Sequence, residues 1–200
     1  MSEDAVDRSK RRFLVAMTAT TGAVGVAGMV VPFVKAMSPS ARAKAAGAPV
    51  EVDISKMQTG EMIIVEWRKK PVMIVKRSDQ NLADLSKLND KLSDIPSESS
   101  KQPDYAKNEF RARKDEKNIL VMVGICTHLG CSPKYIPEMA AEGLGDDWIG
   151  GFFCPCHGSK FDLAGRVYAK VPAPLNMEIP KYKFINKTII LVGDDTGATA

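Results

Sequence analysis

Cysteine and histidine are scarce in this sequence: its 200 residues contain four cysteines and two histidines. Four cysteines are too few for a disulfide-rich scaffold, which excludes that class of small secreted fold. Aromatic residues make up 6% of the chain, and the net charge is only +4. Much of this weak positive charge is local to the N-terminal end, so it does not indicate a nucleic-acid-binding surface, and we expect no nucleic-acid partner.

Charge is absent from one long stretch near the N-terminus. Residues 13–34 (FLVAMTATTGAVGVAGMVVPFV) contain no charged side chain. As a helix they would rise about 33 Å, which is enough to cross the apolar core of a bilayer. A cleaved signal peptide is the alternative, because residues 41–48 (ARAKAAGA) offer small-residue cleavage sites. Since the apolar core of a signal is usually about 7–15 residues, we expect a retained, single-pass transmembrane helix.

Basic residues flank this apolar stretch unequally. A single basic residue, Lys35, follows the stretch, whereas four precede it: Arg8, Lys10, Arg11 and Arg12. The positive-inside rule therefore predicts a cytoplasmic N-terminus over residues 1–12 and places the bulk of the chain across the membrane. Residues 9–14 (SKRRFL) resemble a twin-arginine export signal, although a plain basic flank is the alternative. No transit segment rich in Arg and Ser precedes the stretch, so we expect a bacterial inner-membrane protein with its head in the periplasm.

Small residues follow the apolar stretch. Residues 35–49 have two prolines and few large apolar groups. Such a segment buries little surface, and it predicts a flexible hinge linker that reaches on the order of 50 Å when extended. The remainder, residues 50–200, then forms one head domain.

Short apolar runs in the head predict strands, and the fold class is mainly antiparallel β. One helix interrupts them, because leucines 82, 85, 88 and 92 share one face and Pro96 ends the pattern. Residues 97–117 are polar and charged, which predicts a solvated surface excursion. The predicted strands are residues 50–54, 61–67, 71–75, 119–123, 165–169, 175–179, 181–185 and 188–192.

All six cysteines and histidines lie in two segments, CTHLGC (126–131) and CPCHGS (154–159). Tight turns rich in Gly and Pro are how loops aim several ligands at one point. Two thiolates and two imidazoles suit tetrahedral zinc, but a zinc finger pairs its cysteines and then its histidines. Here each loop mixes both types, which suits a two-iron cluster whose irons take two cysteines and two histidines respectively.

The two loops resemble those of Rieske [2Fe–2S] proteins residue for residue. The order of anchor, linker, helix insertion, loops and Pro172-Ala173-Pro174 is more narrowly similar to the Rieske subunit of the cytochrome bc complex. The resemblance implies an antiparallel β-sandwich head with a cluster-binding subdomain at about residues 124–175. It also implies one [2Fe–2S] cofactor, held by the thiolates of Cys126 and Cys154 on one iron and by His128 and His157 on the other.

The remaining cysteines match the loop-to-loop disulfide of the family, Cys131 with Cys156; two free buried thiols are the alternative. Ser159 stands where the hydroxyl of relatives donates a hydrogen bond to the cluster. Many relatives carry a tyrosine two residues later, and this chain has Phe161 instead. A phenyl ring cannot donate, so we expect a lower redox potential than that of tyrosine-bearing relatives.

The resemblance also implies how the site works. His157 would contact the quinol at the site shared with cytochrome b, while Leu129, Pro172 and Pro174 would help to cover the cluster and dock the head. Ordinary packing is the alternative for Leu129, and an ordinary turn for the two prolines.

The function that follows is electron transfer from ubiquinol to a membrane-anchored cytochrome c, as a subunit of quinol–cytochrome c reductase. The enzyme is an oxidoreductase and translocase coupled to proton translocation, and its partners are cytochrome b, that cytochrome c and the lipid bilayer, in a dimeric complex. Two alternatives are a Rieske subunit of another exported oxidoreductase, such as arsenite oxidase, and an oxygenase-type Rieske ferredoxin. A zinc-binding structural module is a more distant one.

Overall fold

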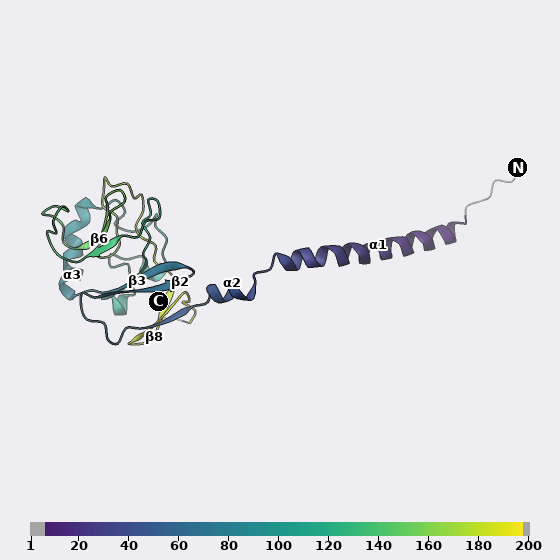
Figure 1. The fold of residues 1–200 in the computed structure, drawn as a ribbon, viewed down its shortest axis with the longest axis horizontal. Coiled ribbons are helices and arrows are strands. Elements are labelled where there is room, and N and C mark those ends of the chain that lie inside the picture. The colour runs from purple at the N-terminus through teal and green to yellow at the C-terminus, as the bar shows by residue number, and fades with distance from the viewer. Residues whose placement is uncertain (1–6, 198–200) are drawn as a thin grey trace. The chain divides into compact units, whose positions relative to one another are not determined.

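The protein, as a computed structural model, is described over residues 7–197, apart from the side chains of residues 42, 44 and 46. The first half of the predicted cytoplasmic N-terminus, residues 1–6, lies outside the described part. The chain divides into two compact units, Met1–Ala45 and Ala46–Ala200 (Figure 1).

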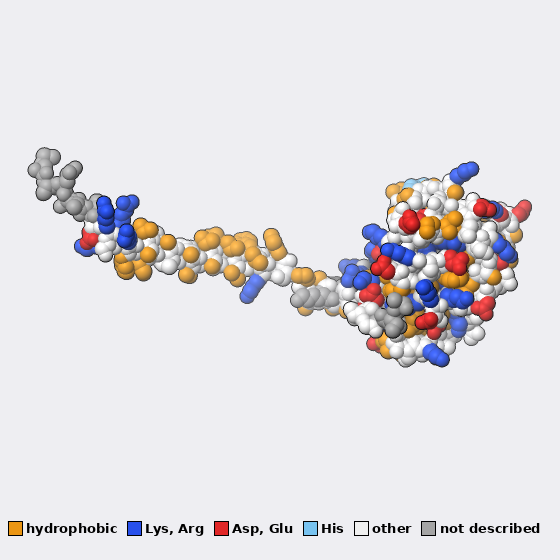
Figure 2. Space-filling view, turned by 180° about the vertical axis from the view of Figure 1, so that it is seen from behind, with side chains coloured by type: hydrophobic (Ala, Val, Ile, Leu, Met, Phe, Trp, Pro, Cys, Tyr) orange, Lys and Arg blue, Asp and Glu red, His pale blue; other side chains and the backbone are white. Residues whose placement is uncertain are grey.

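The first unit is mainly one long helix. Helix α1 (Arg8–Ala36) begins at Asp7, whose carboxylate accepts hydrogen bonds from the N–H groups of Ser9 at 2.9 Å and Lys10 at 3.3 Å. None of its side chains is buried. Figure 2 shows hydrophobic side chains along its length and Lys and Arg gathered at its start. The predicted apolar helix is confirmed, and it is long and apolar enough to cross a membrane by length and composition.

A second helix lies inside the predicted hinge linker. Helix α2 (Ala41–Ala46) has six residues, and the Ser40 hydroxyl accepts from the N–H of Ala43 at 3.1 Å. Alanine has the highest helix propensity, which explains why this small-residue stretch takes a turn of helix instead of remaining extended.

The second unit contains three antiparallel sheets of three strands each within the described residues. The predicted mainly antiparallel β class is therefore confirmed. In order across each sheet, the strands are β1 (Val50–Asp53), β9 (Ile189–Val192) and β8 (Tyr182–Asn186); β2 (Met62–Trp67), β3 (Lys70–Lys76) and β4 (Ile119–Val123); β5 (Lys134–Ile136), β6 (Gly151–Cys154) and β7 (Ser159–Asp162).

The main core draws on all three sheets. Strand β4 is buried at every position, as are residues 72–75 of β3, so both faces of this sheet are covered. Such strands are continuous apolar runs, unlike the alternating pattern of half-exposed strands. Val52 and Ile190 enter the core from the first sheet, and Phe152 enters from the third.

The predicted helix is real but divides into two geometries. Helix α3 (Asp79–Asp84) starts at a capping box formed by Ser78 and Asn81, and a 3₁₀ helix, η1 (Leu85–Lys91), continues it. The predicted leucine face is buried, at residues 82, 85, 88 and 92.

The predicted solvated excursion at residues 97–117, called the insertion segment below, is right only in part: Lys101, Lys107 and Lys114 are exposed, but other residues of the segment are buried. Ser97, Ala106, Arg111 and Ala112 are fully buried, and two short 3₁₀ helices form there, η2 (Asp104–Ala106) and η3 (Lys114–Glu116). Polar composition misled the prediction because these polar groups turn inward, where buried hydrogen bonds satisfy them.

Two predicted strands, at residues 165–169 and 175–179, are also wrong: the described structure has no strand in either range. Their backbone groups bond irregularly. The N–H of Met177 donates to Gly165 O at 2.9 Å, and the N–H of Val167 donates to the side-chain oxygen of Asn176 at 2.7 Å. The two segments therefore lie side by side without forming a ladder.

Candidate metal centre

Strand ends position the two cysteine–histidine loops. The first loop (126–131) follows β4, and the second loop (154–159) connects β6 to β7 as a hairpin. Each loop makes the same five-residue turn: Gly130 N–H donates to Cys126 O at 3.1 Å, and Gly158 N–H donates to Cys154 O at 3.0 Å. Both glycines have left-handed φ angles, 84° and 77°, which other residues rarely adopt.

A disulfide joins the two loops between Cys131 and Cys156, as predicted. The other two cysteines, Cys126 and Cys154, are free and buried. The sulfur of Cys154 lies within 4.8 Å of both disulfide sulfurs. Because those two sulfurs are bonded to each other, they are not available as metal ligands, and the free thiols remain the only cysteine donors of the described chain.

The two free thiols contact each other. Burial raises the pKa of the Cys126 thiol, and the side chain of Cys154 beside it acts in the same direction. Hydrogen bonds from the His128 backbone and the Ser159 hydroxyl to Cys126 act in the opposite direction. Displacing the protons of two adjacent buried thiols calls for a cationic partner, and a metal ion is such a partner.

Both histidines lie on the outer side of these thiols. The rings of His128 and His157 meet edge to face, with centroids 4.7 Å apart. His157 is exposed, and His128 is partly exposed. The neighbouring Leu129 is 71% exposed, which rules out its alternative role as a core leucine. Figure 2 shows histidine at the surface of the head beside hydrophobic side chains.

This layered donor set fits the predicted cofactor. Two buried sulfurs form an inner pair and two imidazoles an outer pair, which is the arrangement that a two-iron cluster with Cys₂ and His₂ irons requires. The four donors come from two loops that a disulfide already holds together. The four residues needed are therefore present on two loops that already lie together.

A third segment, residues 172–177, borders both loops. The Thr127 hydroxyl donates to Leu175 O, and the N–H of Ala173 donates to the Ser159 hydroxyl at 3.0 Å. Pro172 and Pro174 are exposed on either side of the buried Ala173. The predicted docking prolines thus lie next to the loops. The sequence did not predict the contact of Thr127 with this segment, although Thr127 stands inside the first motif. It could not predict the contact of Ala173, because a backbone N–H donor leaves no signal in the residue type.

Phe161 lies on the same face of the β6–β7 hairpin as the candidate ligand Cys154. In the register of this hairpin, Cys154 faces Ser159 and Phe152 faces Phe161. Residues two apart along a strand share a face, so all four side chains point the same way. Phe161 is fully buried beside the site.

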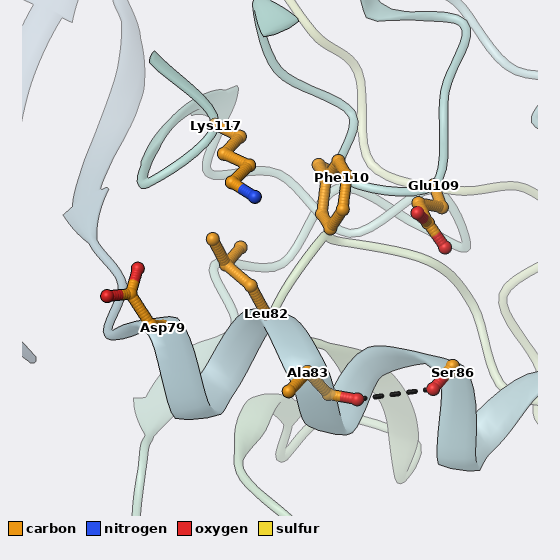
Figure 3. Close-up of a pocket in the computed structure, with 7 residues that line it drawn as sticks. All are labelled: Asp79, Leu82, Ala83, Ser86, Glu109, Phe110 and Lys117. Carbon is orange, nitrogen blue, oxygen red and sulfur yellow. Dashed lines mark hydrogen bonds between the residues drawn. The ribbon is translucent and has the colours of Figure 1, made fainter. Parts of the chain in front are cut away.

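Two cavities lie in the head, one away from the site and one beside it. A pocket of about 410 Å³ lies between α3 and the insertion segment, and none of the predicted site residues lines it (Figure 3). A smaller pocket of about 230 Å³ abuts the first loop, where Cys126, Thr127 and Leu175 form part of its wall.

Known proteins share these features. Residues 89–183 match the Rieske [2Fe-2S] domain family. A protein named "Ubiquinol-cytochrome c reductase iron-sulfur subunit" from Allochromatium vinosum is 56% identical over 198 residues, covering 99% of this chain and 95% of the relative. The protein of the same name from Blastochloris viridis is 39% identical, and the match covers 96% of this chain and 97% of that relative. The chain belongs to the ubiquinol-cytochrome c reductase iron-sulfur subunit family.

Family membership confirms the resemblance drawn from the two loops and assigns a [2Fe–2S] cluster to the head. Residues 1–40 match the family described as "Ubiquitinol-cytochrome C reductase Fe-S subunit TAT signal", in agreement with the twin-arginine interpretation of residues 9–14. A solved structure titled "Hyperthermophilic respiratory Complex III" contains a chain that is 24% identical, with a TM-score of 0.47, covering 88% of this chain and 98% of that one.

Proposed function

We propose that the chain is the Rieske electron-transfer subunit of a quinol–cytochrome c oxidoreductase, and hence part of an oxidoreductase and translocase. The observation that carries the proposal is the pair of adjacent histidine rings at the surface, outside two buried free cysteines. Family membership supports the same function over that of an oxygenase ferredoxin or another exported oxidoreductase.

In this proposal Cys126 and Cys154 hold one iron and His128 and His157 hold the other. When bound, the cluster supplies one-electron chemistry at about −150 to +300 mV, against about −400 mV for plant-type ferredoxins. Two neutral imidazoles in place of two thiolates leave the site less negative, which explains the higher range. The Ser159 hydroxyl accepts from Ala173 and retains its own proton to donate toward cluster sulfur.

The exposed histidine is the proposed contact for ubiquinol. A ligating imidazole uses one ring nitrogen for iron, and the other can donate a hydrogen bond to a quinol oxygen. His157 is exposed and suits this role. The exposed apolar Leu129, with Pro172 and Pro174 nearby, supplies a water-excluding rim for docking on cytochrome b.

The N-terminal unit supports the proposed location. An apolar helix and a match to a TAT-signal family indicate an exported, membrane-anchored chain. We propose the bacterial inner membrane, with residues 1–12 cytoplasmic, 13–34 in the bilayer, 35–49 as the hinge and 50–200 as a periplasmic head. The head would then move between cytochrome b and a membrane-anchored cytochrome c within a dimeric complex.

The ligand assignment has a direct spectroscopic test, because the chain contains only two histidines. Iron-replete protein grown with ¹⁵N-labelled histidine is reduced and examined by electron–nuclear double resonance. Two strongly coupled histidine nitrogens are expected, and unlabelled protein is the control. One coupled nitrogen or none contradicts the assignment, and stoichiometric zinc without an EPR signal contradicts the cluster itself.

A further inference from the structure

The insertion segment places the guanidinium group of Arg111 in the interior of the head. Arg111 is fully buried, and its φ of 50° is left-handed, which is uncommon for a residue with a side chain. Its neighbour Phe110 lies across the pocket from α3 (Figure 3). The side chains of these two adjacent residues therefore point in different directions: Phe110 toward helix α3, and Arg111 toward the cluster-binding subdomain.

All the side-chain hydrogen bonds of Arg111 go to uncharged acceptors. Its Nε and Nη2 donate to the side-chain oxygen of Gln102 at 3.1 and 3.0 Å. Its Nη1 donates to Ala164 O at 3.3 Å and Gly165 O at 3.1 Å, and Nη2 donates to Met177 O at 2.7 Å. Burial lowers the pKa of Arg111 to about 10, so the group is still charged at neutral pH. A planar fork with fixed donor directions suits several carbonyls at once, and lysine cannot reproduce it.

The three backbone carbonyls belong to two segments near Ser159: one follows it along the chain, and the other contacts it in space. Ala164 and Gly165 form the turn that follows β7, the strand that begins at Ser159. Met177 ends the third segment, which also contains Ala173. One guanidinium group therefore holds the turn after β7 and the end of the third segment at a set separation. The Met177 N–H to Gly165 O bond reinforces the same link.

The separation of these segments controls one further contact. Ala173, in the third segment, donates its backbone N–H to the Ser159 hydroxyl at 3.0 Å. A hydroxyl that accepts from a fixed donor has its remaining proton directed elsewhere. Ser159 also faces the candidate ligand Cys154 across the β6–β7 hairpin. A shift of the third segment would thus release the Ser159 hydroxyl to rotate away from the ligand side.

We propose that Arg111 is a positioning residue of the electron-transfer site, because its guanidinium group fixes the third segment and, through the Ala173 amide, the direction of the Ser159 hydroxyl. The proposal rests on the proposed role of Ser159 toward the cluster. It also gives the insertion segment a role in the reaction: the segment carries the group that aligns the two walls of the site.

The test compares midpoint potentials of the iron-replete full chain in four forms: wild type, Arg111→Gln, Ser159→Ala and the double variant. The potential is expected to fall in both single variants and to be the same in the double variant as in Ser159→Ala. An unchanged potential in Arg111→Gln overturns the proposal. A fall that is equally large with and without Ser159 also overturns it, since lost buried charge alone would produce that result.

Arg111→Lys separates charge from geometry. Lysine keeps the positive charge but lacks the fork, so the potential is expected to fall here as well; full retention of the wild-type value contradicts the proposal. If Arg111→Gln does not fold, Gln102→Leu removes the acceptor that orients two guanidinium N–H groups and must lower the potential. An unchanged potential in Ser159→Ala overturns the role of Ser159 and this inference together, whereas a fall there with none in the Arg111 variants overturns this inference alone.

Arg77 supplies a matched control. It is also fully buried, its pKa is also lowered to about 10 by burial, and it donates to three carbonyls, those of Phe110, Leu163 and Lys117. It makes no hydrogen bond to the third segment among those of the described residues. Arg77→Gln should destabilise the head and leave the potential unchanged. Hydrogen exchange at the Ala173 amide should accelerate in Arg111→Gln and not in Arg77→Gln; equal rates in both would contradict the proposal.

Discussion

At the residue scale, the redox potential of the site depends on the few side chains that face it and can donate a hydrogen bond. Strand register puts Phe161 next to Ser159 along the hairpin, on the face that carries Cys154. Ser159 already offers a hydroxyl there, and the phenyl ring of Phe161 offers no donor. The reduced site carries one more negative charge than the oxidised site. Each missing hydrogen-bond donor therefore destabilises the reduced state and lowers the redox potential.

Phe161→Tyr is therefore expected to raise the midpoint potential. One added hydrogen bond contributes about 1 kcal/mol, which corresponds to roughly 40 mV for a one-electron couple. The measurement is an EPR-monitored redox titration of both proteins.

Phe153→Tyr is the control for this change, because it adds the same hydroxyl to the opposite face of the same hairpin. Its potential should match that of wild type. No rise in Phe161→Tyr, or an equal rise in both variants, would show that a donor at position 161 does not tune the site.

Some residues of the site could be predicted and others could not. Cys126, Cys154 and the histidines stand in motifs whose residue types have few other uses, so the sequence alone predicts them as the donors. Arg111 and Ala173 act through carbonyl and amide groups of distant segments, and neither their type nor their spacing announces this. Their roles depend on the fold that brings residues 111, 173 and 177 together.

At the element scale, the strands of the first two sheets and the leucine face were predictable, because their apolar residues form short runs or recur with a regular period. The three short strands of the third sheet, β5, β6 and β7, were not predicted. The segments at residues 165–169 and 175–179 have strand-like composition but no ladder. Here tertiary hydrogen bonds, such as Val167 N–H to Asn176, took the backbone groups that a strand would have used. The prediction for the insertion segment erred for the converse reason: its arginines are polar residues, but the fold buries them.

The linker is the element on which the proposed movement of the head depends. Helix α2 occupies part of it, at Ala41–Ala46. Replacing Ala43 and Ala45 together by proline should stiffen the segment, because proline fixes φ near −65°. We expect quinol–cytochrome c turnover in membranes to fall at least several-fold while the EPR spectrum of the cluster stays unchanged.

The matched control replaces the same two alanines by glycine, which also disfavours helix α2 but adds freedom. Its turnover should remain near that of wild type. Equal loss in the proline and glycine variants would mean that the helix itself matters, and unchanged turnover in the proline variant would count against movement through this segment.

At the scale of the whole molecule, the chain combines an apolar N-terminal helix with a mainly β head whose exposed end carries two histidines. The head was predictable in class because many short strands with one helix leave few alternatives. The combination supports the proposed role of the chain as an anchored domain, whose exposed His157 contacts a membrane-soluble quinol as the quinol gives up an electron together with a proton.

The most direct test of this central claim is a redox titration of the iron-replete full chain, monitored by EPR and repeated from neutral to alkaline pH. The account predicts a potential within the Rieske range of about −150 to +300 mV that falls as pH rises. Its slope should approach about 59 mV per pH unit where one proton accompanies one electron. A low potential near −400 mV that stays flat across the same range would contradict histidine-coupled quinol chemistry.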